Sequence, residues 1–292
     1  MPNPPKQSRT RRDERPENPK PIRLTPRDLA VIQAVCECRV LTTEQLQTLF
    51  FPSMHQAYAR LSALYHHAFL DRRFLGVAVS MMNTPILYVL DRHGAELLQA
   101  QLGMDVDWSS DQKQVSPQFL EHLLAINDVR VAVTKACEQS EDLTLVEWRG
   151  ESDMKADYDH VTIQSEKGRP SSVSVIPDSY FVLDSPQGRA HFFLELDRGT
   201  MTSKRFKTKV LAYQQYYRSG AYQNRFQTKS LRILTVTTSQ ARADTLKVAT
   251  EGAGGKLRFW FTTLDQVHSD RILFDPIWQL ATETDPRPLI EI

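Results

Sequence analysis

The residues best suited to chemistry in this chain are three carboxylates that lie within residues 173–217. Asp178 follows a proline, and Glu195 and Asp197 flank a single leucine in a later run of apolar and aromatic residues. Because alternate residues of a β-strand point to the same face, Glu195 and Asp197 point the same way on an extended chain. Gathered carboxylates repel unless protons or a cation neutralise them, and Mg²⁺ takes oxygen ligands of this kind. The pattern predicts a catalytic or cation site, with ordinary acids at a solvated strand end as the alternative.

Two strands and a helix are needed to position these acids. Residues 184–188, Asp-Ser-Pro-Gln-Gly, have Pro and Gly where the turn of a hairpin needs them. The segment Lys204–Arg218 has the apolar spacing of a helix and follows the second strand. With the hairpin paired, Asp178 at the start of the first strand can face Glu195 and Asp197 on the second.

A strand with Pro-Asp, a strand with Glu-x-acid and then a helix resembles the core of the PD-(D/E)xK nuclease superfamily. That motif places Lys two residues after the Glu, where this sequence has Asp197. The longer string, Pro-Asp-Ser from Pro177 and Phe-Leu-Glu-Leu-Asp-Arg-Gly-Thr from Phe193, is followed by a helix rich in Lys and Tyr. It more closely resembles the replication-relaxation family. Members of that family are associated with plasmids and other mobile elements, and they pair a winged-helix domain with such a core.

The residue types fit a metal-dependent phosphodiesterase, which needs carboxylates for an ion and a base to activate water. The candidate catalytic residues are Asp178, Glu195, Asp197 and Lys209, with Lys207 as an alternative to Lys209 and Tyr213 one turn beyond it. The candidate ligands for Mg²⁺ or Mn²⁺ are Asp178, Glu195, Asp197 and, near the end of an upstream strand, Glu151 or Glu147. The alternative is a core that has lost cleavage and serves as a scaffold or DNA clamp, which Asp197 in place of the motif lysine favours.

Five cations in twelve residues lie beside the carboxylates: Arg198, Lys204, Arg205, Lys207 and Lys209. This cluster predicts a rim that binds phosphate, and a solvated helix face is the alternative.

Residues 22–101 have the order of elements of a winged helix-turn-helix. Capping residues mark the starts of three short helices: Thr25 ahead of Pro26, Thr42 or Thr43, and Ser53 ahead of a helix from Met54 to Ala68. Residues 70–74 and 86–90 are rich in strand-forming residues and predict a hairpin, whose loop would be the wing.

The third helix of this segment predicts contact with double-stranded DNA. Gln56 and Arg60 lie one turn apart on its outer face, and Gln suits adenine edges while Arg suits guanine edges or phosphate. His67, Arg72 and Arg73 are expected at the DNA backbone. A winged helix that docks another protein is the alternative, and a homodimer or a protein partner also fits the sequence.

Composition limits these interpretations. The chain has 292 residues, 41% hydrophobic and 24% charged, which fits a globular protein of two domains. A net charge of +1 means that DNA affinity must come from local patches. Three cysteines without a C-x-x-C pair predict neither a disulfide framework nor a zinc ribbon, and they favour a reducing cytoplasm. No apolar run is long enough to span a bilayer.

The expected fold class is α/β, with an N-terminal winged helix-turn-helix followed by a mixed-sheet, restriction-endonuclease-like α/β domain. The expected boundaries are a disordered basic tail (1–21), the winged helix (22–101), a linker (102–118), the nuclease-like domain (119–274) and a C-terminal tail (275–292). A helix with His122, Asn127 and Asp128 extends the family resemblance, although His or Asn on a core helix more often satisfies a buried hydrogen bond.

The function these observations predict is a DNA-binding protein of a plasmid or mobile element, acting in replication or its regulation, with a second domain that need not be catalytic. The alternative is a metal-dependent DNA endonuclease directed by its winged helix. A component of a toxin–antitoxin or phage-defence system, with a protein partner, is a third interpretation.

Overall fold

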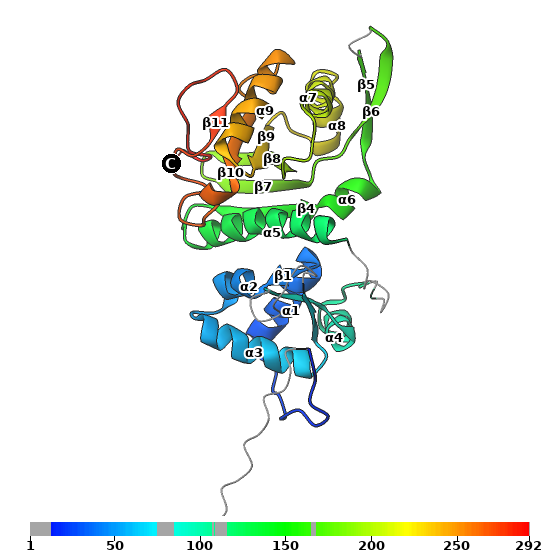
Figure 1. Ribbon diagram of the computed structural model, residues 1–292, viewed down its shortest axis with the longest axis vertical. Coiled ribbons are helices and arrows are strands. Elements are labelled where there is room, and N and C mark those ends of the chain that lie inside the picture. The colour runs from blue at the N-terminus through cyan, green and yellow to red at the C-terminus, as the bar shows by residue number, and fades with distance from the viewer. Residues whose placement is uncertain (1–12, 75–84, 107, 109–115, 165–167, 292) are drawn as a thin grey trace, which may run out of the picture. The chain divides into compact units, whose positions relative to one another are not determined.

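The computed structural model describes residues 13–74, 85–106, 108, 116–164 and 168–291. The chain divides into two compact units, an N-terminal unit that ends at Asn127 and a C-terminal unit that begins at Asp128. Figure 1 shows both units. The division falls inside helix α5 (Pro117–Glu138), later in the chain than the linker that the sequence predicts at 102–118.

The N-terminal unit contains three helices, then a hairpin, then a fourth helix and the first half of α5. Its elements are α1 (Pro26–Cys38), β1 (Leu41–Thr42), α2 (Thr43–Phe50), α3 (Met54–His66), β2 (Leu70–Phe74), β3 (Ile86–Leu90) and α4 (Arg92–Leu102). The three strands form an antiparallel sheet in the order β1-β3-β2. Thr25, Thr42 and Ser53 each accept a backbone hydrogen bond at a helix start, as their sequence positions predict. The expected wing includes residues 75–84, which lie outside the described residues.

The structure differs from the expected disordered tail at residues 13–21. The Nη2 atom of Arg15 lies 2.6 Å from a carboxylate oxygen of Asp91 and 3.3 Å from one of Asp71. Its guanidinium lies over the ring of Tyr65, 4.5 Å from the centroid. Two acids and an aromatic face therefore hold a segment whose own composition is too polar to order itself. Residues 1–12 lie outside the described residues.

The C-terminal unit is a mixed α/β structure, and this confirms the predicted fold class. After α5 its elements are β4 (Thr144–Gly150), α6 (Glu151–Ala156), β5 (Asp159–Gln164), β6 (Pro170–Val175), β7 (Ser179–Ser185), β8 (Gly188–Asp197), α7 (Ser203–Arg218), α8 (Ala221–Phe226), β9 (Arg232–Thr237), α9 (Gln240–Gly252), β10 (Phe259–Thr263), the short 3-10 helix η1 (Leu264–Gln266) and β11 (Gln279–Leu280). A six-stranded sheet has the order β11-β10-β9-β8-β7-β4. Strands β8, β9 and β10 are parallel, and the other pairs are antiparallel. Helices α7, α8 and α9 cover one face of this sheet, and the part of α5 that belongs to this unit lies along the other (Figure 1).

The β7–β8 hairpin has the predicted turn, because Ser185 pairs with Gly188 at its tip. At its open end Ser179 pairs with Leu194, so Asp178 lies next to the acidic end of β8. The backbone N–H of Asp178 donates to the carbonyl of Leu194 at 2.9 Å and fixes this register. Strand β9 lies between β8 and β10 and is buried along nearly its whole length, as its unbroken apolar run predicts.

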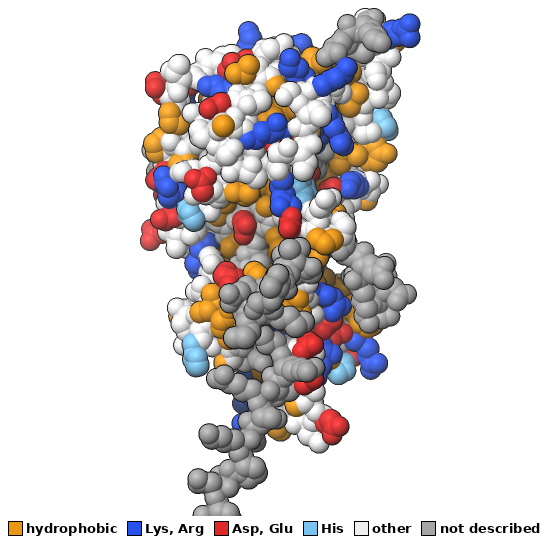
Figure 2. Space-filling view, in the orientation of Figure 1, with side chains coloured by type: hydrophobic (Ala, Val, Ile, Leu, Met, Phe, Trp, Pro, Cys, Tyr) orange, Lys and Arg blue, Asp and Glu red, His pale blue; other side chains and the backbone are white. Residues whose placement is uncertain are grey.

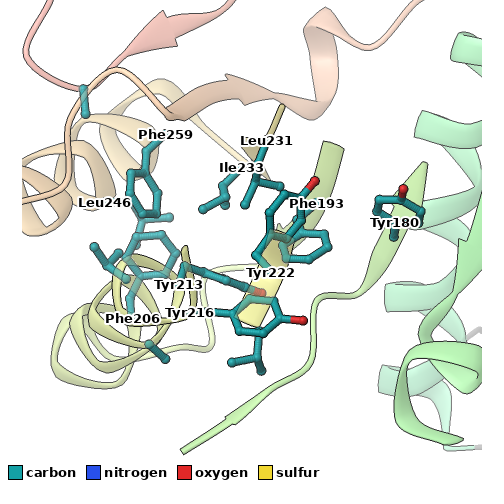
Figure 3. Close-up of a cluster of buried hydrophobic side chains, with 14 of the residues drawn as sticks. Tyr180, Phe193, Phe206, Tyr213, Tyr216, Tyr222, Leu231, Ile233, Leu246 and Phe259 are labelled. Carbon is teal, nitrogen blue, oxygen red and sulfur yellow. The ribbon is translucent and has the colours of Figure 1, made fainter. Parts of the chain in front are cut away.

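Many charged side chains remain at the surface (Figure 2), whereas an aromatic core fills the space between the sheet and helices α7 to α9 (Figure 3). Phe193 on β8 packs in this core with side chains from α7 and α8. The buried side of α7 carries Phe206, Val210 and Tyr213, which recur at helical spacing. Fully burying each large apolar side chain contributes about 1.5–3 kcal/mol. Because side chains alternate along β8, Glu195 projects to the same face as Phe193, beneath α7.

Two segments are more ordered than their sequences indicate. Residues 152–172, which have no clear pattern, contain most of α6, all of β5 and the start of β6, and β5 and β6 pair as a two-stranded ribbon. Residues 275–292, expected to be a tail, contain β11, which pairs with the edge of β10. Trp278 in this segment is fully buried, and its indole N–H donates to the carbonyl of Ile272 at 2.9 Å. The C-terminal residues therefore complete the sheet and its core.

Among the described residues, none of the helices has both the length and the apolar character needed to cross a membrane.

Candidate functional site

Glu195 is the centre of a polar cluster between β8 and α7. Its side chain is buried, and each of its two carboxylate oxygens accepts one hydrogen bond. The ammonium of Lys209 donates to Oε2, and the hydroxyl of Tyr213 donates to Oε1. Lys209 and Tyr213 are four residues apart on α7, so one helical face presents both donors to the sheet. The helix predicted at Lys204–Arg218 therefore supplies a lysine that contacts Glu195.

Asp178 completes this cluster from the start of β7. It is half-buried, and its Oδ2 accepts a hydrogen bond of 2.7 Å from the backbone N–H of Leu196. Its negative charge acts on the ionisation of Glu195, Lys209 and Tyr213. The structure thus brings together Asp178, Glu195, Lys209 and Tyr213, which we call the carboxylate–lysine site.

Burial and charge oppose each other in the carboxylate–lysine site. Burial raises the pKa of Glu195 against the attraction of Lys209, and the charge of Asp178 adds to the rise. Burial alone would lower the pKa of Lys209, but attraction to Glu195 and Asp178 outweighs it, and the pKa of Lys209 is raised. Burial and the neighbouring Glu195 raise the pKa of Tyr213 well above its ordinary value. Lys209 therefore stays charged and Tyr213 stays a proton donor across the physiological range.

Asp197 lies on the same face of β8 but belongs to a separate ion pair. Arg242 of α9 donates hydrogen bonds to both carboxylate oxygens of Asp197, with Nε–Oδ2 at 2.6 Å and Nη2–Oδ1 at 3.0 Å. The hydroxyl of Thr237 and the backbone N–H of Gly199 also donate to Oδ2, at 3.3 Å and 3.2 Å. Asp197 thus has a full set of partners that does not include Glu195.

This arrangement differs from the expected gathering of three carboxylates around one ion. Within the described residues, no group of three or more His, Cys, Asp or Glu side chains is arranged to hold a metal ion. Arg242 neutralises Asp197, and Lys209 with Tyr213 occupies both oxygens of Glu195. The three acids therefore do not fit a shared Mg²⁺ or Mn²⁺.

The two further candidate ligands pair with local cations. Glu151 begins α6 and lies 2.5 Å from the ammonium of Lys155. Glu147 lies on β4 and accepts a hydrogen bond of 2.6 Å from Arg149. Each of these acids therefore pairs with a cation that follows it by two or four residues.

Arg242 is the functional residue that sequence reasoning missed. It follows the N-cap Ser239 in the first turn of α9, and nothing in its local sequence connects it to Asp197. The connection arises from the parallel pairing of β8 with β9, in which Asp197 is opposite Thr237. That register places the start of α9 beside the end of β8. Only a prediction of the order of the strands, and not a sequence motif, could have revealed the contact between Arg242 and Asp197.

The predicted phosphate-binding rim is partly exposed. Lys204 and Arg205 are exposed at the start of α7, whereas Lys207 and Lys209 are partly buried. Arg198 is also partly buried. Figure 2 shows Lys and Arg side chains on the visible face of the C-terminal unit.

In the N-terminal unit, Gln56 is exposed on α3 as predicted, whereas Arg60 is partly buried and its guanidinium turns toward α1. Arg60 forms a two-point ion pair with the fully buried Asp28 of α1, with Nε–Oδ1 at 2.7 Å and Nη2–Oδ2 at 2.5 Å. Burial alone would raise the pKa of Asp28, but the hydrogen bonds from Arg60 and Thr25 outweigh it and lower that pKa. Arg60 thus holds α3 against α1.

The other predicted DNA contacts also have partners within the unit. A ring nitrogen of His67 lies 2.8 Å from the carbonyl of Lys20. The guanidinium of Arg72 lies 4.4 Å from the ring centroid of Tyr65. Arg73 forms an ion pair with Asp71. A role for these residues at DNA stays a prediction, and it requires some of these contacts to be exchanged.

Asn127 satisfies buried backbone groups, as expected for a polar residue on a core helix. Its side-chain nitrogen donates to the carbonyls of Cys38 at 3.2 Å and Val40 at 2.6 Å, where α1 leads into β1. Within the N-terminal unit, Asn127 therefore fastens the first half of α5 to the segment that joins α1 to β1.

The fold and site define a two-unit protein whose second unit is a mixed-sheet α/β structure with a carboxylate–lysine site. The family model described as replication-relaxation matches residues 32–229, which are 198 of the 292 residues. The chain therefore belongs to the replication-relaxation family, and the resemblance noted in the sequence is confirmed.

Comparison with solved structures finds a similarity to the restriction endonuclease FokI. The two chains share 10% identity with a TM-score of 0.27, over 82% of this chain and 42% of the FokI chain. A similarity this distant carries no argument about function, and the present chain spans less than half the length of that enzyme. No curated protein matches the chain.

Proposed function

We propose that this protein binds double-stranded DNA through its N-terminal unit and acts in the replication of a plasmid or other mobile element, or in the control of that replication. The observation that carries the proposal is the family match, which begins in α1 and extends past α8 and so spans both units.

The architecture of the N-terminal unit supports DNA binding. Three helices followed by a hairpin in a three-stranded sheet are the elements of a winged helix, whose third helix enters the major groove. Helix α3 exposes His55, Gln56, Tyr58 and Ala59 along one side. Gln56 is our candidate for base contact, and His67, Arg72 and Arg73 are our candidates for phosphate contact. Arg60 supports binding indirectly, because its ion pair with Asp28 fixes the orientation of α3.

We further propose that the carboxylate–lysine site is not catalytic and instead fastens α7 to the sheet. A metal-dependent phosphodiesterase needs carboxylate oxygens available to its ion. Here both oxygens of Glu195 accept hydrogen bonds from α7, and both oxygens of Asp197 accept them from α9. These contacts support a structural role for residues that resemble a nuclease motif.

A metal-dependent endonuclease is the second candidate function. One observation favours it: Asp178, Glu195 and Lys209 share a site, with the lysine supplied by α7 rather than by the motif position on β8.

One experiment separates these functions. Plasmid DNA is incubated with the protein and Mg²⁺ or Mn²⁺, beside an Asp178→Ala/Glu195→Ala variant, and the products are run on a gel. We expect DNA that is shifted but intact, with a weaker shift for Gln56→Ala and for Arg73→Ala. Arg189→Ala, which removes an exposed cation from the other unit, is the matched control and should leave the shift unchanged. No shift at low salt would overturn DNA binding. Cleavage that the double variant abolishes would replace the structural role by the endonuclease.

A further inference from the structure

A pocket in the C-terminal unit lies apart from the carboxylate–lysine site. It has a volume of about 420 Å³ and opens where β9 and β10 begin, beside the end of α7 and the turn after α9. Its lining includes four cations, Arg218, Arg232, Lys256 and Arg258, and three aromatic residues, Tyr217, Phe259 and Trp260. Among the described residues that line it, none is Asp or Glu.

The cations give this basic pocket a positive potential at its mouth. Arg218 and Lys256 are exposed, and Arg258 is half-buried. Burial lowers the pKa of Arg232 at the inner wall, and Glu291 is the acid whose charge opposes that shift. Three further cations therefore lie near the rim of a hollow without acidic lining, which favours an anionic ligand.

Two guanidinium groups in the pocket lie over aromatic rings. The Cζ atom of Arg258 lies 3.5 Å from the ring centroid of Tyr217, and that of Arg232 lies 5.0 Å from the ring of Trp260. The N–H groups of a guanidinium point outward along its edge, where phosphate oxygens can accept two parallel bonds. A guanidinium plane also offers a surface on which a base can stack.

The walls of the basic pocket are held by hydrogen bonds of their own. Gln214 on α7 donates to the carbonyl of Ala253 at 2.9 Å and accepts from Arg218 at 3.1 Å, which ties the helix to the turn after α9. Gly254 in that turn has a φ of 79°, a conformation that favours glycine. Arg232 donates to the carbonyl of Leu289 at 2.7 Å. These hydrogen bonds therefore fix the positions of Arg218 and Arg232 in the pocket wall.

The basic pocket is far from the acids of β8. Arg232 pairs with Phe192, five residues before Asp197 on the same strand. At about 3.3 Å per residue this separation is about 17 Å. Substitutions at the mouth of the pocket can therefore be made without touching Glu195 or Asp197.

We propose that the basic pocket binds a nucleoside phosphate, either as a free nucleotide or as the 5′-phosphorylated end of a DNA strand. Arg218 and Lys256 receive the phosphate, and the guanidinium of Arg258, which lies over Tyr217, offers its outer face to the base. A volume of about 420 Å³ lies within the range of small-ligand pockets. The proposal does not rest on binding of duplex DNA by the N-terminal unit.

The test titrates the full chain with a fluorescent adenosine triphosphate analogue, and separately with a single-stranded oligonucleotide that ends in a 5′-phosphate or a 5′-hydroxyl. Lys256→Ala and Arg258→Ala should each weaken binding of the preferred ligand by at least about tenfold, as expected for loss of a charge-assisted contact at Lys256 and of the stacking surface at Arg258. Arg189→Ala removes an exposed cation from the start of β8 and should change affinity by less than about twofold. Lys256 is exposed, so its replacement leaves folding intact, which a thermal melt checks.

The outcomes distinguish the two sources of the phosphate. Saturable binding of the nucleotide supports a free ligand, and preference for the phosphorylated over the hydroxyl oligonucleotide supports a strand end. Binding of neither, equal losses in Arg189→Ala and Lys256→Ala, or equal affinity for the two oligonucleotides without nucleotide binding would overturn the proposal. Each of these failures leaves duplex binding untouched, because no double-stranded DNA enters the assay.

Discussion

Replacement of Lys209 by methionine tests whether Glu195 depends on its cation. The substitution keeps the length of the side chain and removes the ammonium that donates a hydrogen bond to Glu195. Removing one partner of a buried ion pair costs about 3–5 kcal/mol because the other charge is left uncompensated. The side chain of Lys209 is 26% exposed, so we take the lower limit, about 3 kcal/mol at pH 8.

The size of this loss should depend on pH. Burial raises the pKa of Glu195 in the folded protein, so its own contribution favours folding at low pH and is lost as the pH rises through that raised pKa. Lys209 holds the pKa of Glu195 down, and without it that pKa rises further. In the variant, Glu195 therefore stays protonated to a higher pH in the folded protein. Between the pKa of Glu195 in the unfolded chain and this raised pKa, the folded protein binds more protons, so stability falls as the pH rises. The expected loss is about 1 kcal/mol at pH 5 and about 3 kcal/mol at pH 8.

The assay is urea denaturation of Lys209→Met and of the unsubstituted protein at both pH values. Lys207→Met, two residues earlier on α7, is the matched control, and it should change stability by no more than about 0.5 kcal/mol. Equal losses for the two lysine variants, or a loss for Lys209→Met that is the same at pH 5 and pH 8, would refute the view that Lys209 holds down the pKa of Glu195.

Three further predictions concern the remaining polar contacts. Tyr213→Phe removes only the hydroxyl that donates to Glu195 and should cost about 1–3 kcal/mol, measured by the urea midpoint; no change would mean that water replaces the hydroxyl. Asp197→Asn and Arg242→Ala should each destabilise the protein, and their double-mutant cycle should give a coupling of at least about 1.5 kcal/mol, since Asp197 is 2% exposed and Arg242 18%; additive losses would contradict the pair. Arg60→Ala should lower the free energy of unfolding by about 3 kcal/mol because it leaves the buried Asp28 without its cation. Gln56→Ala should weaken the gel shift and leave the melting temperature unchanged. A weaker shift with an unchanged melting temperature for Arg60→Ala would instead make Arg60 the residue that contacts DNA.

The parts of this structure that local chemistry decides could be predicted from the sequence. Thr25 and Ser53 cap their helices because each hydroxyl accepts a hydrogen bond from a backbone N–H only three residues later in the chain. The unbroken apolar run of β9 indicated a central strand because such a run must be covered on both faces. Lys209 and Tyr213 were recognised together because they lie one turn apart. These features need no knowledge of which strands are neighbours.

The parts that could not be predicted depend on distant pairing. Asp28 and Arg60 lie in different helices, and nothing in either helix shows that the guanidinium turns inward to a buried acid. The partner of Asp197 becomes visible only when β8 and β9 pair in parallel. The β5–β6 ribbon was missed because its apolar residues are few, although Val161 and Ile163 on β5 join the core beneath α7.

The position of Asp197 explains why a nuclease-like pattern and a structural role can coincide. A lysine there, as the motif requires, would project to the same face of β8 as Glu195 and supply its cation from within the strand. With an acid at this position, each of two neighbouring carboxylates needs a cation from elsewhere. Glu195 receives Lys209 from α7, and Asp197 receives Arg242 from α9. The single departure from the motif thus converts one self-contained site into two attachments, each joining the sheet to a different helix.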